Sequence, residues 1–160
     1  MAKLFETQRK LDKRIVETHH LQGQSFVSEK VLALLVELGE LANETRCFKF
    51  WSFKGPSDRP VILEEYVDGL HFILSVGLDL NYETVELDPQ TGSETTLSNC
   101  FLNVFSTINK FNQDTSVQNY KDVFETFLVL GYQLGFSNED IVQAYARKNV
   151  INHERQEQGY

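Results

Sequence analysis

Apolar residues recur along most of this chain at intervals of three and four positions, the spacing that places them on one face of an α-helix. The clearest stretch follows Ser28, a residue well suited to cap a helix. Its apolar positions are Val31, Leu34, Leu35, Leu38, Leu41 and Ala42. The alternation typical of strands is not found. The pattern therefore predicts an all-α fold, a compact bundle of about five to six helices.

Short polar breaks divide the chain into the predicted helices. Pro60 suits the first turn of the third one, because its missing N–H would have no partner there. Ser137 is expected to cap the last one, with Glu139 and Asp140 beside the positive end of its dipole. The segment 79–96 is the weakest for regular structure. The predicted ranges are about 4–20, 28–48, 60–80, 96–111, 117–134 and 137–155.

Length and charge limit the class of protein. A chain of 160 residues fits a single domain, residues 1–160, and is long enough to bury a core without disulfides or a structural metal. The formal net charge is −8, from 23 acidic and 15 basic residues, whereas a general nucleic-acid-binding surface is basic. We therefore expect no nucleic-acid partner. The excess of carboxylates is compatible with a cation site.

The cysteines and the N-terminus indicate a cytoplasmic protein. Cys47 and Cys100 are far apart and have no metal-binding spacing, so we expect buried thiols in a reducing compartment. The N-terminus becomes polar at once and lacks the apolar core of a secretion signal. No apolar run approaches the ~20 residues needed to span a bilayer. We expect no membrane partner.

Two acidic pairs lie on consecutive predicted helices, Glu37 with Glu40 and Glu65 with Asp68. Residues three apart share one face of a helix, so an antiparallel packing of these two helices would make the four carboxylates converge. Like charges repel, and burial adds a desolvation cost, but a bound hard cation removes both penalties. Because no Cys or His accompanies these oxygens, the donor set favours Mg²⁺ or Mn²⁺ over zinc.

The spacing of these carboxylates alone leaves two interpretations open. The pairs could also be solvated faces of ordinary amphipathic helices. Gly39 lies between Glu37 and Glu40, and a glycine inside a helix costs about 1 kcal/mol relative to alanine. It suggests the close approach of another helix or of a ligand, without deciding between the two interpretations.

The order Glu37-x-x-Glu40, then 24 residues, then Glu65-x-x-Asp68 resembles the signature of the all-α nucleoside triphosphate pyrophosphohydrolases. That superfamily includes MazG-like proteins and the dimeric dUTPases. The surrounding sequence resembles the dimeric dUTPase branch in residues 34–44, 47–51 and 68–72.

The last predicted helix carries a further resemblance. Lys148, Asn152 and Arg155 are spaced i, i+4 and i+7, which places two cations and an amide on one stripe. The segment is similar to the family's phosphate-binding stretch, and an arginine can bind phosphate with two hydrogen bonds. A basic helix end that complements the helix dipole is the alternative interpretation.

Candidate nucleoside contacts come from two other segments. Gln8 and Asp12 are similar to a nucleoside-side motif of the family, although relatives often have Asn where Asp12 stands. Trp51, the only tryptophan, could stack on a pyrimidine or could belong to the core or an interface. His71 is three residues after Asp68, and we interpret it as a hydrogen-bonded structural residue rather than a metal ligand.

The resemblance implies hydrolysis of dUTP to dUMP and pyrophosphate, with dUDP as a second possible substrate. It implies two or more Mg²⁺ ions, for which Mn²⁺ can substitute, held by Glu37, Glu40, Glu65 and Asp68, and a homodimer. By family position, Glu37 is the favoured general base. Two alternatives stay open: a MazG-like enzyme that acts on another nucleotide, and a non-catalytic helical module whose acidic face binds a protein.

Overall fold

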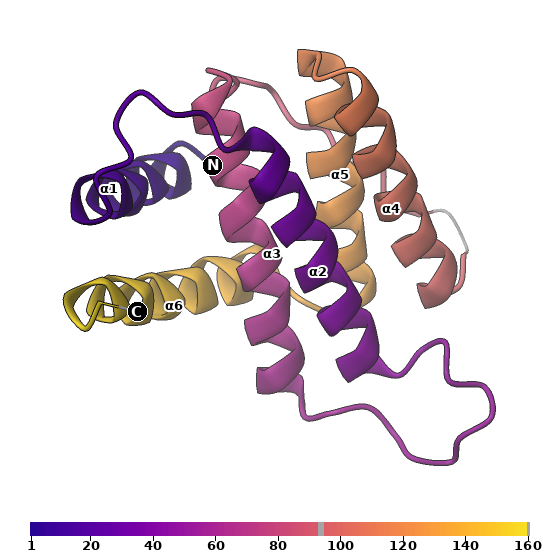
Figure 1. The fold of residues 1–160 in the computed structure, drawn as a ribbon. Helices are drawn as coiled ribbons and strands as arrows, with labels where there is room; N and C mark the ends of the chain where they lie inside the picture. Colours follow the sequence, from indigo (N-terminus) through magenta and orange to yellow (C-terminus); the bar gives the residue numbers. More distant parts are fainter. Residues whose placement is uncertain (93–94, 160) are drawn as a thin grey trace.

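The computed structural model describes residues 1–92 and 95–159, and the regular structure of this part is entirely α-helical (Figure 1). The prediction of an all-α fold is confirmed. Within the described part, the helices are α1 (Ala2–Thr18), α2 (Val27–Thr45), α3 (Arg59–Asp79), α4 (Leu97–Gln113), α5 (Val117–Gln133) and α6 (Asn138–Glu157).

Helix α3 lies at the centre of the molecule (Figure 1). It packs against α1, α2, α5 and α6, while α4 packs on α5 and α2. Its buried residues occur on every side, as expected of a helix with neighbours all around it. They include Leu63, Tyr66, Val67, Leu70, Ile73 and Leu74. Most polar side chains on this helix therefore lie close to another helix.

Helices α2 and α3 lie side by side and run antiparallel (Figure 1). Helix α2 ends where Arg46 adopts a left-handed conformation, with φ of 56°. The Arg46 guanidinium donates to Ser52 Oγ at 2.8 Å, and Ser57 N donates to the Glu44 carbonyl at 2.9 Å. These bonds tie the connecting loop back onto the end of α2. Pro60 then lies in the first turn of α3, as predicted.

One predicted helix cap is wrong, although the helix starts within one residue of the expected position. Helix α2 begins at Val27, with Phe26 in the N-cap position, so Ser28 lies inside the first turn. The Phe26 carbonyl accepts the first helical bond from Lys30 N at 2.9 Å. Val27 packs against the core, and burial of this side chain extends the helix past the serine.

The start of α6 agrees with the prediction. Ser137 Oγ accepts from Asp140 N at 3.1 Å, and Asp140 Oδ2 accepts from Ser137 N at 2.8 Å, a reciprocal capping box. The described residues of the segment 79–96 contain no helix or strand beyond the end of α3, as predicted, and residues 93–94 lie outside the described part. Cys100 is buried, whereas Cys47 is only half-buried, and both are free thiols. In the described part, no helix is long and apolar enough to cross a membrane.

Candidate active site

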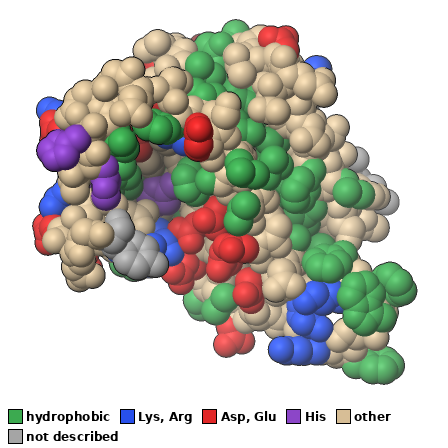
Figure 2. Space-filling view, in the orientation of Figure 1, with side chains coloured by type: hydrophobic (Ala, Val, Ile, Leu, Met, Phe, Trp, Pro, Cys, Tyr) green, Lys and Arg blue, Asp and Glu red, His purple; other side chains and the backbone are tan. Residues whose placement is uncertain are grey.

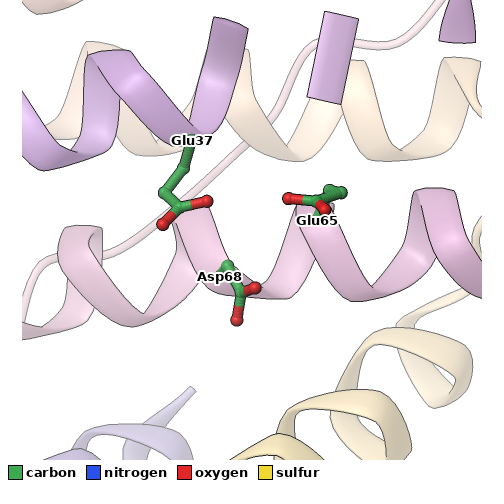
Figure 3. A group of neighbouring side chains, drawn as sticks. All are labelled: Glu37, Glu65 and Asp68. Atoms are coloured by element: carbon green, nitrogen blue, oxygen red, sulfur yellow. The ribbon is translucent and has the colours of Figure 1, made fainter. Parts of the chain in front are cut away.

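Three carboxylates converge where α2 and α3 face each other (Figure 3). Glu37 extends from α2, and Glu65 and Asp68 extend from α3. One oxygen atom of each carboxylate can be chosen so that all three atoms lie within 4.8 Å of one another. The antiparallel packing of the two helices thus brings these three predicted ligands together.

Glu40, the fourth predicted ligand, lies at the outer edge of this group. Its side chain is exposed, and it hydrogen-bonds Glu37. Its charge also raises the pKa of Glu65. Together with Glu44 and Glu65 it lines an open cavity of about 590 Å³. A ligand in this cavity would therefore meet both Glu40 and Glu65.

Gly39 does not mark a close contact between helices. Among the described residues, no atom of a neighbouring element comes within 4 Å of the position that a Cβ would take. Leu32 and Val36, on the same helix, are 63% and 52% exposed, so this face of α2 is not covered within the chain. Within the described part of the chain, no other helix therefore approaches Gly39, and the close approach of a ligand stays a prediction.

Burial and mutual repulsion weaken the acidity of the three carboxyl groups. The pKa of Glu37 is raised to about 7, first by burial and then by the charge of Asp68 and the hydrogen bond with Glu40. Burial also raises the pKa of Glu65 and that of Asp68. A divalent cation would relieve this repulsion and replace the lost hydration. Because the donors are all carboxylate oxygens, the residues present fit Mg²⁺ or Mn²⁺.

Lys148 of α6 forms an ion pair with this acidic group. Its side chain is buried, and its Nζ lies 2.8 Å from Glu64 Oε1 and 3.0 Å from Asp68 Oδ2. Burial lowers the pKa of Lys148, but the hydrogen bonds to the two carboxylates outweigh this and raise it. The sequence did not predict the pairing, because Lys148 and Glu64 come together only through the packing of α3 on α6.

The other predicted phosphate ligands follow Lys148 on the same stripe of α6. Asn152 and Arg155 are half-buried. The positive charge of Arg155 opposes the rise in the pKa of Asp68. Two cations that the sequence analysis did not single out, Arg59 and Arg147, line a cavity of about 330 Å³ together with Lys148. A basic surface therefore adjoins the carboxylates.

The predicted nucleoside residues of α1 belong to a buried polar network. Gln8 is only 3% exposed, and its Nε2 donates to Asp12 Oδ1 at 2.8 Å. Its Oε1 lies 2.7 Å from both His71 Nδ1 and the Tyr145 hydroxyl. Ser75 Oγ donates to Asp12 Oδ2 at 2.8 Å. We name these five residues the Gln8 network.

The Gln8 network contains one predicted structural residue and two residues that the sequence did not indicate. Burial raises the pKa of Asp12, although the hydrogen bonds from Gln8 and Ser75 oppose this. Burial lowers the pKa of His71 to about 3, so its ring is neutral at physiological pH. The interpretation of His71 as a hydrogen-bonded residue is confirmed. Ser75 and Tyr145 lie 63 or more positions from Gln8 or Asp12, and only the fold brings them together.

Trp51 lies apart from this network. It is 64% exposed in the loop between α2 and α3, and its ring contacts those of Phe48 and Phe50. Figure 1 shows this loop at the far end of α2 and α3 from α1. The structure does not bring Trp51 to Gln8 and Asp12 within one chain.

A hollow separates the acidic surface from the two outer helices. Figure 2 shows acidic side chains gathered over α2 and α3, with the hollow beside them between α1 and α6. Basic side chains lie at its α6 edge. The hollow therefore adjoins both the acidic side chains of the candidate cation site and basic side chains suited to an anionic ligand.

A family model for dUTPase matches residues 1–160. The chain belongs to the dUTPase family. Its helical fold and its two acidic pairs agree with the all-α branch of that family, the branch that the sequence resembles. A search of curated proteins finds no match. The match to the dUTPase family model identifies the chain as a dUTP diphosphatase that acts on deoxyuridine nucleotides. It favours this function over the MazG-like and non-catalytic alternatives.

Proposed function

We propose that the chain hydrolyses dUTP to dUMP and pyrophosphate with Mg²⁺ held by Glu37, Glu65 and Asp68, and with Glu40 at the outer edge. The convergence of three carboxylate oxygens within 4.8 Å carries this proposal. When bound, the cations supply charge neutralisation for the phosphates and increase the acidity of a nearby water. The family resemblance favours two or more ions, with Mn²⁺ as a substitute and dUDP as a second substrate.

The chain's own residues then divide the work. A carboxylate oxygen of Glu37 takes the proton of the attacking water, which the family position of this residue supports. Asn152 and Arg155, on the stripe that starts at Lys148, bind the phosphate oxygens, and Arg155 can do so with two parallel hydrogen bonds. Lys148 pairs with Glu64 and Asp68 in the free protein, so a cation on Asp68 would release one of these two contacts for a phosphate oxygen.

The hollow between α1 and α6 is proposed to receive the deoxyuridine, with Gln8 and Asp12 at its base edge. Trp51 lies far from these residues in one chain, so a contact of its ring with the nucleoside would come from a second subunit. We propose a homodimer on the family resemblance. Exposed apolar side chains on the loop support it, since Phe50 is 93% and Phe53 108% exposed. We further propose one domain, residues 1–160, in the cytoplasm.

The decisive experiment measures pyrophosphate release from dUTP, dTTP, dCTP, dATP and dGTP, in Mg²⁺ and in EDTA. Glu65→Gln is compared with Glu29→Gln, a matched control on the exposed start of α2. We expect metal-dependent turnover of dUTP alone, lost in Glu65→Gln and kept in the control. Turnover of other nucleotides would indicate a MazG-like specificity. Turnover that persists in EDTA would contradict the metal site.

A further inference from the structure

The side-chain amide of Gln8 is held in one orientation by three neighbours. Its Nε2 donates to Asp12 Oδ1 at 2.8 Å, and its Oε1 accepts from the Tyr145 hydroxyl at 2.7 Å. The Oε1 also lies 2.7 Å from His71 Nδ1. A rotation of the amide by 180° would set its oxygen against the Asp12 carboxylate. The orientation is therefore determined by the chemistry of the contacts.

These contacts also determine the tautomer of His71. An amide oxygen only accepts, so Nδ1 must carry the proton and donate it to Gln8. His71 Nε2 is then an acceptor, and it is buried with no partner among the described residues. The imidazole stacks on the Tyr145 ring, with centroids 4.2 Å apart. The two side chains that donate to Gln8 thus also pack against each other.

Asp12 is fixed in a similar way, from two sides. Its Oδ1 accepts from Gln8 and its Oδ2 accepts from Ser75 at 2.8 Å. Each carboxylate oxygen has a second lone pair, and Gln8 Nε2 has a second hydrogen. A ligand that reaches both residues therefore meets a donor on Gln8 beside an acceptor on Asp12.

This donor and acceptor match one pyrimidine edge and oppose another. Uracil presents a carbonyl oxygen next to the N3–H, which is an acceptor beside a donor. Cytosine presents an amino group next to a bare N3, so both groups would face a like partner. A site built to hydrogen-bond one edge rejects the edge that leaves its buried groups unpaired. Thymine has the same edge as uracil and is not distinguished here.

We propose that His71 and Tyr145 are positioning residues that lock the Gln8 amide, so that the enzyme accepts a uracil edge and rejects a cytosine edge. This rests on the proposed function, since it requires the base of dUTP to face Gln8 and Asp12. Neither residue touches the phosphates in this proposal. Their effect is therefore on base discrimination and not on the hydrolytic step.

The test measures kcat/KM for dUTP, dCTP and dTTP in Mg²⁺ for Tyr145→Phe and for the double variant His71→Leu with Tyr145→Phe. The amide keeps one of its three tethers in the double variant. We expect the dUTP/dCTP ratio to fall roughly tenfold in the single variant and roughly a hundredfold in the double variant. The dUTP/dTTP ratio should not change. His71→Asn, which keeps a donor near Nδ1, should retain most of the discrimination.

Tyr120→Phe is the matched control for the loss of a buried hydroxyl. The Tyr120 hydroxyl donates to the Ile73 carbonyl at 2.9 Å, away from Gln8, so its removal should leave both ratios unchanged. Thermal unfolding of each variant verifies that it is folded. Nitrogen-15 NMR of the His71 ring should show a protonated Nδ1 and a bare Nε2.

Three outcomes would contradict these proposals in different ways. A wild type without turnover of dUTP, or without preference for it over dCTP, would overturn the proposed function and the lock together. A strong wild-type preference that survives in the folded double variant would overturn the lock alone. The opposite His71 tautomer would also overturn the lock, because Nδ1 could no longer donate to Gln8.

Discussion

The carboxylate group and the Gln8 network both contain residues of helix α3, but their polar atoms interact in opposite ways. Like charges repel one another in the first, and donors pair with acceptors in the second. Glu65 and Asp68 face Glu37 with like charges, and burial raises the pKa of all three. In the Gln8 network, donors meet acceptors at 2.7–2.8 Å. In the proposed function a bound cation stabilises the first group, whereas the second is ordered before any ligand arrives. The proposed chemistry and the proposed recognition of the substrate thus have different physical origins.

The largest expected effect comes from the loss of one of the converging carboxylates. Asp68→Asn should lower kcat/KM for dUTP by roughly 10³-fold, because it removes a proposed cation ligand and one of the two carboxylate partners of Lys148. Steady-state pyrophosphate release measures this, with Glu29→Gln as the control. A loss of less than about tenfold would show that these carboxylates do not carry the metal chemistry.

A second prediction concerns stability: a cation bound by the carboxylate group should stabilise the folded state. At a Mg²⁺ concentration about 100 times its Kd, the folded state should gain about 2.7 kcal/mol. For a chain of this size, that corresponds to an increase in Tm of roughly 5–10 °C. Calorimetry in Mg²⁺ and in EDTA measures the shift. It should vanish in Glu65→Gln, whose Tm in EDTA should exceed that of the wild type because one repelling charge is gone.

The fold was predictable because helical periodicity is a local property. Helix α2 and the capping box at Ser137 follow from residues that are neighbours in sequence. The error at Ser28 has a tertiary cause, since the packing of Val27 on the core extends the helix past a good capping residue. A sequence pattern ranks cap residues but does not show which apolar neighbours become buried.

The candidate site was predictable where a motif lies within one helix. Glu65 and Asp68 share a face by spacing alone, and the antiparallel packing of α2 on α3 brings Glu37 to them. The partners of Lys148 and Gln8 were not predictable, because they come from helices far along the chain. The sequence likewise grouped Trp51 with the nucleoside residues, although the fold places it at the other end of α2.

A third prediction concerns the pH dependence of the Gln8 network. The pKa of His71 is lowered to about 3 in the folded state, against an ordinary value of 6.5. Its contribution to stability is therefore complete above pH 6.5 and is lost as the pH falls toward 3, because the unfolded chain binds the proton more readily. Between pH 6.5 and 5 the loss should be about 2 kcal/mol. Urea unfolding should show this slope in the wild type and in His20→Asn, and not in His71→Asn.

The smallest expected effect has the opposite sign and comes from the carboxylate group. The pKa of Glu37 is raised from 4.5 to about 7, so the folded state binds a proton that the unfolded chain does not. Stability should therefore rise as the pH falls from 7 toward 4.5, by about 1 kcal/mol once solvent screening of this half-exposed group is taken into account. Urea unfolding of Glu37→Gln in EDTA should lack this slope.

Mg²⁺ should also abolish this pH dependence of stability in the wild type, because a cation among the carboxylates keeps Glu37 ionised. If the pH dependence from Glu37 persists in saturating Mg²⁺, the cation binds away from Glu37. The pH dependence from His71 should be the same with and without Mg²⁺. The pair of titrations thus separates the group that needs a ligand from the network that does not.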